Sequence, residues 1–190
     1  MARAGFHPTV ASVIGFLRFV GLLNAAVWLG AAVFFTFGAG PAAFSDEMKT
    51  LLGPKNHPYF SGAIAQVLIA RYFTFQLICG VIAALHLFTE WLYLGRPMRR
   101  FTGYLLVGLL LLGLAGDFGM QPKIKRLHAA KYAVNATPQS REAAARSLAA
   151  WHGVAQSVNL LMLAGLVVYV WRVANPSEAT RFVPAVKLRG

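Results

Sequence analysis

The sequence predicts an all-α fold, an integral membrane four-helix bundle. Of its 190 residues, 57% are hydrophobic and 13% are charged, whereas an ordinary soluble domain is roughly 45–50% apolar and about 25% charged. The apolar residues gather in long runs, and a run of about 20 residues is long enough to cross a bilayer as a helix. Backbone polar groups in lipid must bond to each other, which makes each run helical. We expect one domain over 1–190, with approximate spans 12–38, 72–95, 101–120 and 152–173.

The first run contains one charge, Arg18, and is longer than the roughly 7–15 apolar residues of a signal peptide, so we expect it to be the first transmembrane helix. The second contains His86 and Glu90, the third closes near Asp117, and the fourth opens at His152. Four crossings bring both chain ends to one side of the membrane. We call that side A and the opposite side B.

Both connections on side B predict further helix. Phe44, Met48, Leu51 and Leu52 lie at helical spacing, Ser45 can cap and Gly53-Pro54 ends the run, which predicts a short surface helix after helix one. Lys123, Lys125, Arg126 and Lys131 form a basic stretch between helices three and four. Thr137 and Pro138 suit a new helix start. A helix from there to Ala174 would be roughly 55 Å long at 1.5 Å per residue. We therefore expect a basic helical extension that projects from side B.

The net charge of +12 makes this a basic protein, and its partners follow from where the charge lies. The basic residues stand between and beyond the apolar runs, so we expect the lipid bilayer and its anionic headgroups as partners, and no nucleic acid. The Arg96–Arg100 turn is the densest basic cluster beside membrane ends, which favours side A as the cytoplasmic side. Ala-, Gly- and Arg-rich usage favours a bacterial inner membrane.

Arg18 and Glu90 lie at matched depths near side A, in helices one and two. Ionisable residues inside a membrane usually pair or serve a function. We therefore expect an intramembrane ion pair between Arg18 and Glu90. The alternative is that Arg18 snorkels and that Glu90 reaches water at the headgroups.

A second polar group is expected near side B. Arg71, Asp117 and His152 fall near one level, and Gln156 and Asn159 follow His152 on the same helix face. These five residues would form a ligand-binding funnel for a polar or anionic ligand. The alternative is interhelical hydrogen bonding that only holds the bundle together, at about 0.6 kcal/mol per bond.

No cofactor, metal or enzymatic activity is expected. His86 and His152 are offset by roughly 15 Å along the membrane normal, too far to share one haem iron. Cys79 is the only cysteine, and the chain has no phosphate-binding loop, nucleophile elbow or zinc-protease motif. Small residues four apart, such as Gly21 and Ala25, allow close helix packing. They leave a homo-oligomer or a larger membrane complex open.

Three segments carry a family resemblance, namely Trp28-Leu29-Gly30 with Gly40-Pro41-Ala42, Pro58-Tyr59-Phe60, and His152 followed by Ser157 and Asn159. Together they resemble the transmembrane protein 205-like family, a domain of unknown function in small four-helix membrane proteins. The resemblance covers most of 20–170, although helix three matches nothing distinctive. It implies the same fold, brings no reaction or substrate, and singles out Trp28, Gly30, Pro41, His152 and Asn159 for testing.

The sequence therefore favours a non-enzymatic membrane protein, acting as a small transport-related or accessory component with a polar site at one membrane face. A structural subunit of a larger membrane complex is the main alternative. A membrane b-type haem protein is the second.

Overall fold

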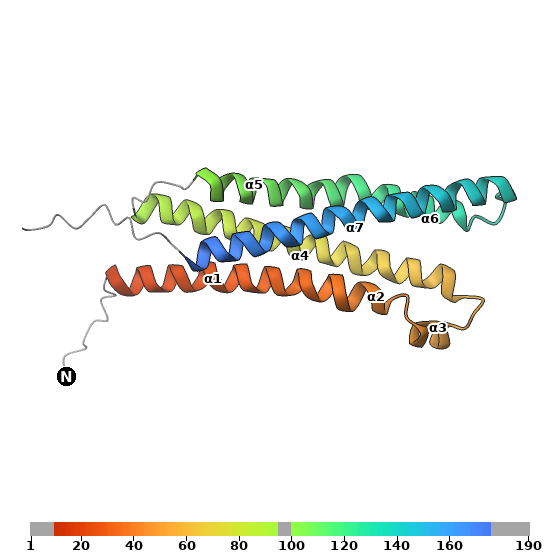
Figure 1. The fold of residues 1–190 in the computed structure, drawn as a ribbon, viewed down its shortest axis with the longest axis horizontal. Helices are drawn as coiled ribbons and strands as arrows, with labels where there is room; N and C mark the ends of the chain where they lie inside the picture. The colour runs from red at the N-terminus through yellow and green to blue at the C-terminus, as the bar shows by residue number, and fades with distance from the viewer. Residues whose placement is uncertain (1–9, 95–99, 176–190) are drawn as a thin grey trace, which may run out of the picture.

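The computed structural model describes residues 10–94 and 100–175, and within those ranges the chain is helical without strands (Figure 1). The elements are α1 (Val10–Phe34), η1 (Phe35–Ala39), α2 (Gly40–Ala42), α3 (Asp46–Leu52), α4 (His57–Leu94), α5 (Arg100–Leu114), η2 (Ala115–Met120), α6 (Gln121–Lys131) and α7 (Pro138–Ala174), where η marks a π-helical segment. Most of the predicted Arg96–Arg100 turn lies outside the described residues.

Four antiparallel rods form the bundle. The first is α1 with η1 and α2, the second is α4, the third is α5 with η2 and α6, and the fourth is α7 (Figure 1). The helix α1 packs against α4 and α7, and α5 packs against the same two helices. Val10, Leu94, Arg100 and Ala174 lie at one end, which is side A, while α3 and the α6–α7 hairpin lie at side B (Figure 1). The predicted all-α four-helix architecture is confirmed.

The outer surface of this bundle is apolar. Large hydrophobic side chains such as Phe16, Phe34, Leu85 and Leu161 are exposed on different helices, and surface of this kind suits lipid rather than water. Four helices are long and apolar enough to cross a membrane, over Val13–Ala42, His57–Leu92, Arg100–Lys131 and Pro138–Ala174. The chain is thus a multi-pass membrane protein.

The caps that the sequence predicts are present. Thr137 Oγ1 accepts a hydrogen bond of 3.2 Å from the Ser140 amide, and Pro138 opens α7. Ser45 Oγ accepts one of 3.3 Å from the Met48 amide at the start of α3, and Gly53, with φ +74°, follows its end. The predicted surface helix and basic extension are both confirmed, as α3 and as α6 with the first turns of α7.

The helix α4 begins at His57, well before the expected start near Tyr72. Pro58 does not prevent this, because proline in the first turn lacks only an amide that would have had no intrahelical partner. The Phe60 amide already bonds to the Asn56 carbonyl at 3.0 Å. Arg71 therefore lies within a continuous helix and does not open it.

Each of the two π-helical segments is followed closely by a proline. Pro41 comes two residues after η1 ends, and Pro122 comes two residues after η2 ends. A proline ring inside a helix clashes with the carbonyl four residues earlier, and a wider π turn just before it moves that carbonyl aside. The first and third rods therefore continue past their prolines.

Candidate functional site

A chain of hydrogen bonds joins three of the four rods midway along the bundle. Asn159 of α7 donates from Nδ2 to Thr36 Oγ1 of η1 at 2.8 Å, and Tyr72 of α4 donates from its hydroxyl to Asn159 Oδ1 at 3.3 Å. Thr36 in turn donates to the Ala32 carbonyl at 2.7 Å. The ring of Phe35 stacks on Tyr72 with centroids 4.1 Å apart. Asn159 is thus the shared partner of α1–η1 and α4.

A second polar contact lies one turn further along α4. Trp28, 1% exposed, donates from Nε1 to Oε1 of Gln76, which is 2% exposed. The amide nitrogen of Gln76 has no hydrogen-bond partner among the described residues. The Tyr72 hydroxyl lies near Gln76, and its own hydrogen is donated to Asn159. An unmatched buried donor of this kind costs about 1–3 kcal/mol.

Two adjoining cavities lie beside these polar groups. The outer cavity has room of about 80 Å³ and lies between η1, α4, α6 and α7, with Tyr72, Ile124, Ala155 and Asn159 in its wall. The inner cavity has room of about 10 Å³, enough for one water-sized group, and is lined by Trp28, Gln76 and Asp117 among apolar residues. Phe73 and Met162 belong to both walls. The two cavities therefore lie side by side, with these side chains between them.

The position of Phe73 depends on a glycine in the π segment of the third rod. A Cβ atom placed on Gly116 would overlap the Phe73 ring. Asp117 follows directly in η2, is half-buried, and forms no ion pair with any described residue. Hence η2 places the Asp117 carboxylate at the inner cavity. Gly116 leaves space for the Phe73 ring, which stands between the inner and the outer cavity.

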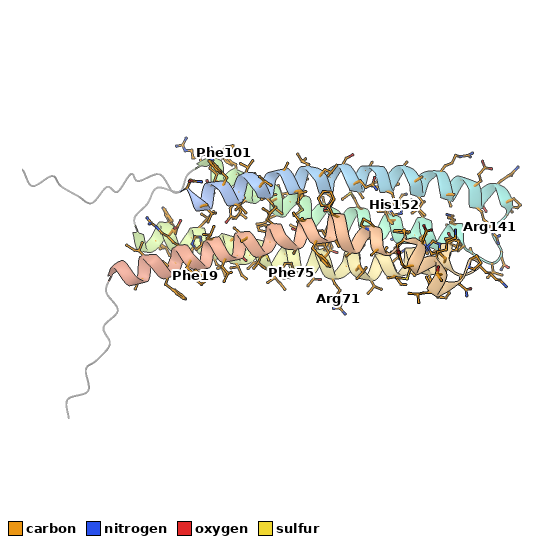
Figure 2. All side chains as sticks on the ribbon, turned by 60° about the horizontal axis from the view of Figure 1, so that its bottom comes forward. Phe19, Arg71, Phe75, Phe101, Arg141 and His152 are labelled. Atoms are coloured by element: carbon orange, nitrogen blue, oxygen red, sulfur yellow. The ribbon has the colours of Figure 1, made fainter. Side chains whose placement is uncertain are left out.

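The five predicted funnel residues do not form one cluster. Asp117 lines the inner cavity and Asn159 the outer one. His152 is half-buried and lies toward Lys131 and His128 of α6. Arg71 is exposed and points away from the bundle (Figure 2), and Gln156 is exposed as well. Matched depth placed these residues at similar levels, but their positions around each helix separate them.

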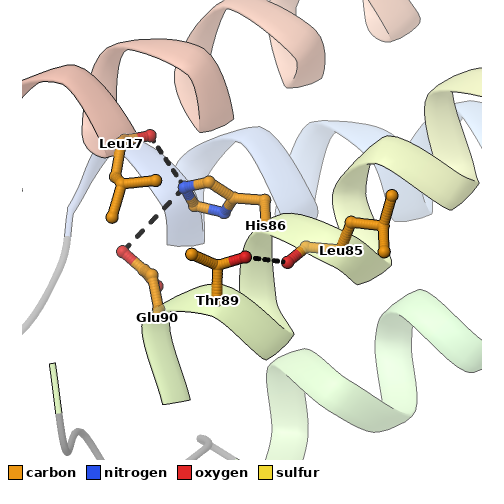
Figure 3. A network of polar contacts seen from close by, with 5 residues as sticks. All are labelled: Leu17, Leu85, His86, Thr89 and Glu90. Atoms are coloured by element: carbon orange, nitrogen blue, oxygen red, sulfur yellow. Dashed lines mark hydrogen bonds and ion pairs between the residues drawn. The ribbon is translucent and has the colours of Figure 1, made fainter. Parts of the chain in front are cut away.

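The expected Arg18–Glu90 ion pair is absent among the described residues. His86 Nε2 lies 2.8 Å from the Leu17 carbonyl oxygen and 4.0 Å from Oε1 of Glu90 (Figure 3). Arg18 is exposed, because successive residues on a helix point about 100° apart and Leu17 is the one that faces α4. In the sequence, His86 and Glu90 stand four residues apart and therefore share one face of the helix. A glycine of the neighbouring helix lies opposite that face.

That glycine is Gly21, where an added Cβ would overlap the His86 ring. Of the family-like motif residues, Trp28 is buried and packs edge-on against Tyr169 at 6.1 Å. Gly30 and Pro41 are not part of either cavity wall, although Pro41 follows η1. Sequence reasoning overlooked Thr36, Tyr72 and Phe73 as site residues, since aromatic and hydroxyl side chains inside an apolar run look like ordinary helix surface.

Comparison with known proteins identifies a family without a known activity. Residues 23–133 match the family described as a domain of unknown function (DUF4149). The match covers α1 from Leu23 onward through α6, including both π segments. It does not support the transmembrane protein 205-like family in particular. No curated protein and no solved structure matches the chain. With more than half of its length matched, this chain belongs to the DUF4149 family, whose function is unknown.

Proposed function

We propose that this chain is a non-enzymatic membrane protein that binds a small, mostly apolar molecule inside its bundle, as a transport-related or accessory component. The observation that carries the proposal is the outer cavity, whose wall is apolar apart from a few polar side chains. Mainly apolar cavities with a few placed polar groups are typical of small-molecule sites.

The wall chemistry supports an apolar guest. Phe35, Ile124 and Met162 contribute apolar surface, and Tyr72 and Asn159 contribute the polar atoms. These two polar side chains are already bonded to each other and to Thr36. They therefore hold the wall in place and offer little unmet hydrogen-bonding capacity to a guest. A polar or anionic ligand, as the sequence alone suggested, fits this cavity less well than a hydrocarbon body does.

The position of the outer cavity within the membrane indicates where its guest would come from. The cavity lies beside segments that are apolar enough to be in a bilayer, so its guest would come from the membrane. We further propose the bacterial inner membrane and kinship with the transmembrane protein 205-like group, on the compositional and motif grounds given above. A structural subunit of a larger complex remains the alternative role, and in that case no saturable guest is expected.

The proposal can be tested with a photoactivatable hydrocarbon, an alkyl chain carrying a diazirine. The protein is reconstituted in lipid nanodiscs, labelled over a range of probe concentrations, and the labelled peptides are identified by mass spectrometry. Saturable labelling of the outer-cavity residues on α4, α6 and α7, competed by unlabelled alkane, is expected.

Two variants of α7 provide the matched comparison. Ala155→Phe places a ring in the outer cavity, whereas Ala164→Phe places the same ring on an exposed position of the same helix. The first should abolish saturable labelling of the cavity peptides, and the second should leave it unchanged. If labelling never saturates, or if both variants give the same labelling of the cavity peptides, the bundle has no internal guest. The structural-subunit alternative is then favoured.

A further inference from the structure

The inner cavity is lined by one buried hydrogen-bond donor without a partner among the described residues and by one half-buried carboxylate, on facing helices. The Gln76 amide nitrogen on α4 lacks an acceptor, and its oxygen is held by Trp28. The Asp117 carboxylate on η2 lines the same cavity and has no ionic partner among the described residues. Ionisable residues at membrane depth are costly and usually mark a functional site. A guest that satisfied both groups would relieve both costs.

The two groups together select a chemical class. The Gln76 N–H needs an acceptor, and the Asp117 carboxylate needs a donor. A hydroxyl does both, because its oxygen accepts while its hydrogen is donated. An ammonium could pair with Asp117 but has no lone pair for Gln76, and a carboxylate would be repelled by Asp117. The cavity wall therefore complements an O–H group better than a charged one.

The rest of the guest follows from the neighbouring cavity. Phe73 and Met162 belong to both walls, so the two cavities are adjacent, and a guest with its head in the inner cavity would place its body in the apolar outer cavity. Met162 is a flexible side chain that adapts to irregular shapes. The Phe73 ring is held over Gly116. A head no larger than a hydroxyl and a longer hydrocarbon body suit the room of about 10 and 80 Å³.

We infer that the guest is an amphiphilic alcohol, with its hydroxyl between Asp117 and Gln76 and its hydrocarbon chain in the outer cavity. This inference rests on the proposed function, since it names the class of molecule that the outer cavity binds. Asp117 accepts the hydroxyl hydrogen, and Gln76 donates to the hydroxyl oxygen. Trp28 fixes the orientation of the Gln76 amide by occupying its oxygen.

The test uses three photoactivatable probes with the same alkyl diazirine chain and different ends, namely methyl, hydroxyl and ammonium. Labelling is measured on the full chain in nanodiscs, and labelling of lipid-facing peptides corrects for differences in partitioning. The hydroxyl probe should half-saturate the cavity peptides at about tenfold lower concentration than the methyl probe, as expected for one hydrogen bond to a charged group.

Asp117→Leu removes the acceptor, and Phe118→Leu, at the neighbouring exposed position, is the matched control. The first should erase the tenfold advantage of the hydroxyl while leaving saturable methyl-probe labelling intact, which also shows that the variant is folded. The second should change neither.

The outcomes separate the two proposals. If the methyl probe saturates but the hydroxyl has no advantage, or if the ammonium probe binds best, the alcohol inference is overturned and the proposed function stands. An advantage that survives in Asp117→Leu likewise overturns the inference. If no probe saturates the cavity peptides, the proposed function fails and the inference fails with it.

Discussion

Replacing Asn159 by leucine should loosen three of the four rods at once. The Asn159 side chain donates to Thr36 at 2.8 Å and accepts from Tyr72 at 3.3 Å. Interhelical hydrogen bonds in membranes average about 0.6 kcal/mol each, so the loss of both lowers the free energy of unfolding by about 1.2 kcal/mol. Leaving the Tyr72 hydroxyl buried without an acceptor can raise that loss toward about 3 kcal/mol.

The assay is reversible unfolding in mixed micelles of mild detergent and dodecyl sulfate, followed by circular dichroism. Gln156→Leu is the control, because Gln156 is an exposed amide one turn earlier on the same helix and its loss should change the unfolding free energy by less than about 0.5 kcal/mol. Equal stability of the two variants would show that the Thr36–Asn159–Tyr72 contacts do not hold the rods together.

Three further predictions follow from individual contacts. Gly21→Ala should lower the unfolding free energy by about 1–3 kcal/mol, because the added methyl overlaps the His86 ring. Gly15→Ala is the control: Gly15 has open space around it, so this variant should be neutral or slightly stabilising in the same assay. Thr137→Ala removes the cap of α7, at a cost of about 1 kcal/mol, and limited proteolysis should cut the α6–α7 loop faster. The purified protein should show no Soret absorption band, since His86 Nε2 is engaged by the Leu17 carbonyl; such a band would restore the haem alternative.

The fold was largely predictable from sequence because hydrophobic length and capping chemistry act locally. A run of apolar residues long enough to cross a bilayer becomes helical wherever its neighbours are, and caps such as Thr137 and Ser45 mark helix starts within three residues. The start of α4 was placed too late, since Arg71 interrupts the apolar run and yet nothing in residues 57–71 ends a helix.

The site was harder to predict, since it depends on which way each side chain points around its helix. Depth along the helix is readable from a count of residues, and two of the residues chosen by depth, Asp117 and Asn159, line the two cavities. The direction of a side chain around the helix axis cannot be counted in the same way. In the first and third rods, the two π segments shift the helix face on which later residues lie. Arg71 was expected in the funnel and Arg18 in an ion pair with Glu90, yet both side chains are exposed because of the helix face on which each lies.

The π segments also explain why the polar groups gather where they do. Thr36 lies in η1 and Asp117 in η2, and both segments contact the same stretch of α4, through Phe35 on Tyr72 and Gly116 beneath Phe73. Each segment stands next to a proline that a regular helix would not accommodate without distortion. Phe35 of η1 lines the outer cavity and Asp117 of η2 lines the inner one, so the wider turns beside the prolines form part of both cavity walls.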